Sequence, residues 1–174
     1  MRGLDRLRTV LDELSDENHY LFTISDFTSL FPGLGYDALK ALLSRAAKRG
    51  VLQRVCSGVY LNPRVSYPRG RVLYHAAARL RSGHFNYLSL ETVLSEAGVI
   101  SQVQFDWICL MSSGRSHTIR CGDFGTIEFV HTKKRPGDIA DKLVYDTRCG
   151  LWRATVELAL QDMRNTGRPM DLID

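Results

Sequence analysis

The sequence lacks the residue patterns that mark most enzymes and metalloproteins. Its four cysteines lie far apart without CxxC spacing, and its five histidines form no HxH or HExxH pattern, which argues against a structural zinc site. It also has no GxSxG, no P-loop and no GxGxxG after a strand. We therefore expect reduced, isolated thiols and a protein that is not an enzyme and needs no cofactor and no metal.

Long apolar segments are absent as well. No apolar run is long enough to span a bilayer, and Asp5, Asp12 and Glu13 interrupt the start of the chain where a signal peptide would need an apolar core. The hydrophobic fraction of 44% and the charged fraction of 24% are ordinary for a globular protein. These features predict a cytoplasmic protein that does not bind membranes.

Acidic residues are almost missing from one part of the chain. Residues 1–34 carry three arginines against six acids, and residues 82–174 carry ten basic against twelve acidic side chains. Residues 35–81 carry ten basic side chains against Asp37 alone, a net charge of +9. A local basic block of this kind is typical of a surface that binds a polyanion. The alternative is a solvated basic face with no partner.

The N-terminal element order predicts a winged helix-turn-helix domain over residues 1–64. Apolar spacing indicates a helix at 4–14 and a strand within 19–24, and Ser25 is placed as the N-cap of a short helix that stops at Pro32-Gly33. A helix at 36–49 ends at Gly50, and two β-type runs at 51–56 and 59–63 flank the turn Ser57-Gly58. In such domains the second helix of the pair enters the major groove and the hairpin forms the wing.

The helix at 36–49 has two separate faces. Leucines and alanines occupy one side, whereas the polar side carries the residues that could contact DNA. Tyr36, Lys40 and Ser44 suit base edges, and the later cations suit phosphates. Together with the wing and the basic segment that follows, the candidate DNA-binding residues are Tyr36, Lys40, Ser44, Arg45, Lys48, Arg49, Gln53, Arg54, Ser57, Arg69 and Arg71.

The pattern of residues 65–174 predicts a basic linker and helix at 65–83 and a small α+β domain at 84–174 with a mainly antiparallel sheet. Its expected elements are a capped helix within 87–101, β-type runs at 105–113, 116–123 and 125–132, a loop at 133–138 and an amphipathic helix at 151–164. Four aromatic residues are expected in its core: Phe105, Trp107, Phe129 and Trp152.

The stretch from ISDFTSLFPG through ALKALLSRAAKRGVLQRVCSGVYLNP resembles the N-terminal winged helix of AbiEi-type antitoxins, and YLSLETVLSEAGVIS resembles the segment that opens their C-terminal domain. These antitoxins are the transcriptional repressors of type IV toxin–antitoxin and phage-abortive-infection systems. The resemblance implies an autorepressor that binds inverted repeats at its own operon. It also implies a functional partner, a nucleotidyltransferase-like toxin that is counteracted without a stable complex.

Two other functions remain open from the residues themselves. The winged helix could dock a protein and bind no DNA. A metal-dependent nuclease is the third hypothesis, because Asp123 and Glu128 are expected on neighbouring strands, although Val130 stands where such cores want a lysine. No heptad seam is long enough for a coiled-coil dimer, so we expect a monomer or a weak dimer that binds DNA repeats cooperatively.

Overall fold

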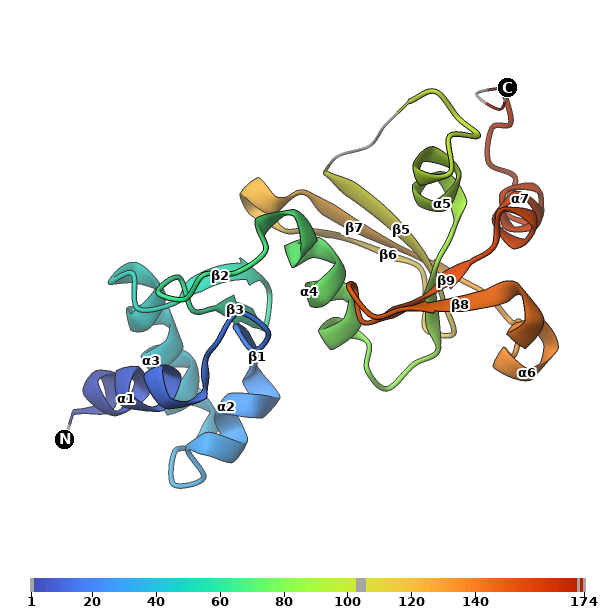
Figure 1. Cartoon of the computed structure of the whole chain (residues 1–174). Helices are drawn as coiled ribbons and strands as arrows, with labels where there is room; N and C mark the ends of the chain where they lie inside the picture. Colours follow the sequence, from blue (N-terminus) through green and yellow to red (C-terminus); the bar gives the residue numbers. More distant parts are fainter. Residues whose placement is uncertain (1, 103–105, 172, 174) are drawn as a thin grey trace. The chain divides into compact units, whose positions relative to one another are not determined.

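The chain folds into two compact units, residues 1–70 and residues 71–174, shown in the computed structural model of Figure 1. The structure describes residues 2–102, 106–171 and 173. Within these ranges, no helix combines the length and the apolarity needed to cross a membrane. The expected strand start and core position at Phe105 lie outside the described residues.

Unit 1 has the predicted winged helix-turn-helix order. Its elements are α1 (Gly3–Leu14), β1 (Leu21–Thr23), α2 (Ile24–Leu30), α3 (Tyr36–Lys48), β2 (Gln53–Cys56) and β3 (Val59–Leu61). The strands form an antiparallel sheet in the order β1-β3-β2, with β3 at its centre. The hairpin β2–β3 is the wing. This confirms the fold class predicted for the N-terminal part of the chain.

The core of unit 1 fixes how α3 is turned. Leu39, Leu42 and Leu43 are almost completely buried, and they pack in one cluster with Leu7 of α1 and Phe27 of α2. Burying a leucine or phenylalanine side chain contributes about 1.5–3 kcal/mol. A rotation of α3 about its axis would expose several of these side chains at once. The polar face of α3 is therefore held outward by the packing of the opposite face.

The cap of α2 differs from the sequence prediction. Thr23, not Ser25, is the N-cap: its hydroxyl accepts a hydrogen bond from the Asp26 N–H at 3.3 Å, and the Asp26 carboxylate accepts one from the Thr23 N–H at 2.8 Å. This reciprocal capping box starts the helix two residues earlier than predicted. Thr23 also ends β1, so the strand passes directly into the helix.

Unit 2 is an α+β unit built on a mixed six-stranded sheet. The strands are β4 (Asn86–Leu88), β5 (Trp107–Ser112), β6 (His117–Arg120), β7 (Thr126–His131), β8 (Leu143–Asp146) and β9 (Leu151–Ala154). Their order is β6-β7-β5-β4-β9-β8, with the pairs β5–β7 and β4–β9 parallel and the other three antiparallel. The sheet is thus antiparallel in most of its pairs, and parallel at two internal positions.

Helices cover both faces of this sheet. They are α4 (Val72–Leu80), α5 (Leu90–Glu96), the short α6 (Pro136–Ile139) and α7 (Val156–Asn165), with 3₁₀ turns η1 (Arg69–Arg71), η2 (Gly122–Phe124) and η3 (Ala140–Lys142). Arg81, directly after α4, lies over the Phe129 ring, whereas Tyr87 donates a hydrogen bond to Asp162 of α7. Tyr87 is in register with Val130 through Met111, and adjacent strand residues point to opposite faces, so Tyr87 and Phe129 lie on opposite faces of the sheet. Helix α4 therefore covers one face, and α5 and α7, which pack together, cover the other (Figure 1).

Several predictions for unit 2 are corrected by the structure. Residues 151–154 form strand β9, and α7 begins only after Thr155, whose hydroxyl accepts from the Leu158 N–H. Trp152 therefore lies on a strand and is 45% exposed, and Trp107 is also exposed, whereas Phe129 is buried as predicted. The expected loop at 133–138 contains the start of α6. The capped helix expected within 87–101 is present as α5, which begins after its N-cap Ser89, and Tyr87 and Leu88 before it belong to β4. Helix α4, predicted with the linker, belongs to unit 2.

Candidate nucleic-acid interface

The candidate interface is the outward face of α3 together with the wing. All the candidate residues on these elements are exposed: Tyr36, Lys40, Ser44, Arg45, Lys48, Arg49, Gln53, Arg54 and Ser57. The helix has the diameter and the polar outer surface required to enter a major groove. The structure thus brings together, on one helix and one hairpin, side chains that the sequence alone could only group by periodicity.

The start of α3 presents an aromatic ring and a cation as a pair. Tyr36 is 59% exposed, and the Lys40 ammonium lies 5.3 Å from the centre of its ring. An exposed cation–π contact of this kind is worth about 0.5–1 kcal/mol. It restricts the Lys40 side chain, which lowers the entropy lost when that side chain binds a partner. Leu34, in the turn before α3, is 39% exposed, and the sequence analysis did not include it among the candidate interface residues. Its position between two glycines was the only sequence feature that indicated exposure.

The wing has a defined shape. Cys56 pairs with Val59 across the two-residue turn Ser57-Gly58, and Gly58 adopts a φ of +80°, which glycine tolerates best. The register shifts between Arg54 and Cys56, so the strand carries a bulge. Cys56 is buried. Arg54 and Ser57 remain on the solvent side.

The wing tip is also tied to the helical part of unit 1. The Ile24 N–H donates a hydrogen bond to the Gly58 carbonyl at 3.2 Å, which joins the turn to the first residue of α2. At the other end of β3, the buried Asn62 donates to the Ser15 hydroxyl at 3.0 Å. Because both ends are anchored, the wing holds a fixed position relative to α3.

The charge of this face is not neutralised within unit 1. Between residues 35 and 64 the sole acid is Asp37, and the ion pairs formed by the described residues of unit 1 do not include Lys40, Arg45, Lys48, Arg49 or Arg54. The ion pair of Arg64 with Asp12, at 3.5 Å, joins two exposed side chains, and such pairs contribute little to stability. The face therefore presents uncompensated positive charge to solvent.

Arg69 and Arg71 belong to neither α3 nor the wing. Both are exposed and belong to η1, where unit 1 ends and unit 2 begins. Their contribution to the interface stays a prediction.

The nuclease hypothesis finds little support in the geometry. The sequence predicted Asp123 on a strand, but the structure places it in the turn η2. Both oxygens of the Glu128 carboxylate are bound by Arg168, at 2.9 and 3.0 Å, and burial, which raises the pKa of Glu128, is outweighed by these hydrogen bonds, which lower it. In the parts of the chain that the structure describes, no group of three or more His, Cys, Asp or Glu side chains could hold a metal ion.

The fold defines unit 1 as a winged helix-turn-helix domain. In a comparison with protein families, residues 10–63 match the family described as transcriptional regulator, AbiEi antitoxin. The match runs from within α1 to the end of the wing and includes no residue of unit 2. It confirms the predicted resemblance over these residues. No curated protein matches the chain.

Proposed function

We propose that this protein is a sequence-specific, DNA-binding transcriptional repressor and the antitoxin of an AbiE-like type IV toxin–antitoxin pair. The observation that supports this most strongly is the uncompensated basic face of α3 and the wing, in a segment that matches a family of transcriptional regulators. A domain that only docked proteins would have no need of this charge.

In the proposed complex, α3 lies in the major groove of double-stranded DNA. Tyr36, Lys40 and Ser44 contact base edges near the start of the helix, where they set the sequence preference. Arg45, Lys48 and Arg49, further along the exposed face, bind phosphates and fix the register of the protein on the duplex.

The wing adds contacts to the same duplex. Arg54, Gln53 and Ser57 are exposed on β2 and its turn, and they contact the backbone beside the groove. Arg69 and Arg71, both exposed in η1, supply further phosphate contacts. Phosphate contacts of this kind strengthen binding to every sequence and make it dependent on salt.

At the level of the system, the protein binds inverted repeats upstream of its own operon in the cytoplasm, as a monomer or weak dimer that binds cooperatively. Unit 2 carries the antitoxin role and counteracts a nucleotidyltransferase-like toxin without a stable complex. The support for these points is the resemblance implied by the sequence and the family match of residues 10–63.

Band shifts on the DNA upstream of the coding sequence test the DNA-binding part. We expect the intact chain to shift this duplex in preference to a scrambled one, and the double variant Lys40→Ala with Arg45→Ala to lose the shift. The matched control, Arg120→Ala with Arg164→Ala, removes the same charge from exposed positions in unit 2. Unchanged affinity in the Lys40 and Arg45 variant would exclude the groove model. Absence of DNA binding together with a stable protein complex would favour the protein-docking alternative.

A further inference from the structure

The sheet of unit 2 has two edges of different character. At one edge, β6 exposes His117, Thr118 and Arg120. Charged and polar side chains of this kind keep a sheet edge from pairing with another chain. At the other edge, β8 exposes Val144 and Tyr145, at 60% and 48%, and its single charged residue is buried. The β8 edge therefore lacks the charges that protect the β6 edge.

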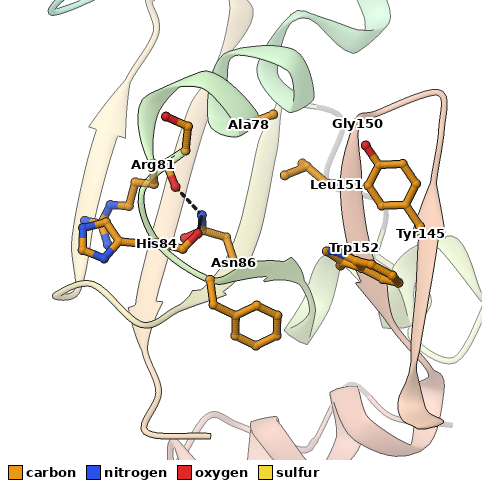
Figure 2. Close-up of a pocket in the computed structure, with 10 residues that line it drawn as sticks. Ala78, Arg81, His84, Asn86, Tyr145, Gly150, Leu151 and Trp152 are labelled. Atoms are coloured by element: carbon orange, nitrogen blue, oxygen red, sulfur yellow. Dashed lines mark hydrogen bonds between the residues drawn. The ribbon is translucent and has the colours of Figure 1, made fainter. Parts of the chain in front are cut away.

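The exposed apolar surface continues from β8 onto the neighbouring strand. Tyr145 is the cross-strand partner of Trp152 on β9, and the two rings meet edge to face with their centres 5.2 Å apart. Trp152 is itself 45% exposed. Both rings line an open pocket of about 330 Å³, whose lining also includes residues between Ala78 and Asn86 (Figure 2). Contiguous exposed apolar side chains of this size indicate a surface for interaction.

The backbone of β8 also directs hydrogen-bonding groups out of the sheet. The Thr155 N–H donates to the Lys142 carbonyl at 2.9 Å, in the same register that pairs Val144 with Arg153. Alternate residues of an antiparallel strand direct both backbone groups to the same neighbour. Lys142 and Val144 therefore face β9, and the residues between and after them, Leu143 and Tyr145, direct their N–H and C=O groups outward. Among the described residues, no strand pairs with β8 on that side.

These outward groups match a second copy of the same strand. When two β8 strands pair antiparallel about a two-fold axis at Val144, Leu143 of each copy lies opposite Tyr145 of the other, and each such pair exchanges both of its hydrogen bonds. Leu143 and Tyr145 point to the same face of the sheet, because they are two residues apart. Leu143 of one copy therefore packs against the exposed Tyr145 ring of the other.

The charges beside β8 favour the same register. With the axis at Val144, Lys142 of each copy lies opposite Asp146 of the other, which pairs opposite charges. With the axis moved to Tyr145, Lys142 would instead lie opposite Arg148, which is exposed. Like charges directly opposite each other destabilise a sheet. The strand is thus complementary to itself in both its backbone groups and its charges.

We propose that the β8 edge of unit 2 pairs with the β8 edge of a second copy of this chain, which makes one continuous sheet across a two-fold interface. A strand of four residues offers less area than the roughly 1,200–2,000 Å² of a standard interface, so the dimer is weak, with a dissociation constant between about 1 μM and 1 mM. Its two-fold symmetry is the symmetry that inverted repeats in DNA share. The pairing does not rest on DNA binding by unit 1 and occurs without DNA.

Cysteine cross-linking of the full chain in the absence of DNA tests the register. Residues opposite each other without hydrogen bonds have Cα atoms about 4.5 Å apart, within the range of a disulfide. Val144→Cys should therefore form an intermolecular disulfide with its own copy under mild oxidation. Thr118→Cys, on the exposed β6 edge, is the matched control and should stay monomeric, as should the wild type, whose four cysteines are buried. Equal cross-linking of both variants, or stronger cross-linking of Tyr145→Cys than of Val144→Cys, overturns the proposal.

Sedimentation equilibrium measures the same association without a cross-link. The average mass of the wild type should rise with concentration up to about 1 mM. Val144→Lys should weaken association at least about fivefold, because it places two like charges opposite each other at the axis, whereas Thr118→Lys on β6 should not. Val144 is 60% exposed, so the variant should fold, and circular dichroism verifies this. A wild-type mass that stays at the monomer value, or equal association in wild type and Val144→Lys, would contradict the assignment.

Discussion

The salt dependence of DNA binding follows directly from the charges on α3 and the wing. Four exposed cations there are assigned to phosphates: Arg45, Lys48, Arg49 and Arg54. If each neutralises one phosphate, the slope of log K against log salt is about −3.6, since each contact contributes roughly −0.9. Affinity should then fall about 150-fold between 50 and 200 mM salt.

Replacing Arg45 by glutamine tests this reasoning. The side chain is exposed, so the fold should be unaffected, and the slope should move from about −3.6 to about −2.7 because one phosphate contact is lost. Affinity should fall equally on the upstream duplex and on a scrambled duplex, since phosphates carry no sequence information. Fluorescence anisotropy over a salt series measures both quantities, with Arg164→Gln as the control. A slope that stays at the wild-type value would refute the placement of Arg45 on the phosphate backbone.

Three further outcomes are expected. Lys40→Ala should lower the preference for the upstream duplex over a scrambled one by about 1–3 kcal/mol, measured by competition, because it removes a base contact; a loss that is equal on both duplexes would contradict this. Gly58→Ala should lower stability in thermal unfolding by about 1–2 kcal/mol, because its φ is +80°, and an unchanged midpoint would show that the turn relaxes. Asp146→Asn should cost about 1.5–3 kcal/mol at pH 7: burial raises the pKa of Asp146, but hydrogen bonds from Arg148 and Arg153 outweigh it and hold the pKa below 3.8. That stabilisation is present above pH 4 and is lost as the pH falls further, so urea unfolding should show the two proteins converging at acid pH.

The N-terminal fold was predictable because its signals are local. The leucine spacing of α3, the glycine that ends it and the turn Ser57-Gly58 each act within a few residues. The error at the N-cap of α2 has the same origin, since Thr23 and Ser25 are both good capping residues. The choice between them depends on where β1 ends and on the Asp26 carboxylate, which makes the capping box with Thr23.

The sheet of unit 2 was less predictable because its strands depend on distant partners. Residues 151–154 fit a helical stripe as well as a strand, and their pairing with β4, more than sixty residues earlier, decides between the two. The exposed Trp152 follows from the same change, because alternate residues of β9 point away from the core. Short strands such as β4 carry too few residues to show a period.

The candidate sites also differ in how far the sequence could predict them. The basic face of α3 is contiguous in sequence, so periodicity identified its members, although not which of them contact bases. The pocket of unit 2 combines residues 78–86 with residues 145–152 from separate elements. These segments come together only through the strand order β4-β9-β8, which no local pattern encodes.

Nuclease footprinting of the DNA upstream of the coding sequence tests the central claim most directly, because it reports where the winged helix binds. We predict two protected segments related as inverted repeats in the presence of the wild-type chain at physiological salt, and their loss in the Lys40→Ala and Arg45→Ala double variant. A uniform cleavage pattern with the wild type, or the same protection with the double variant, would contradict the assignment of α3 as the DNA-binding helix.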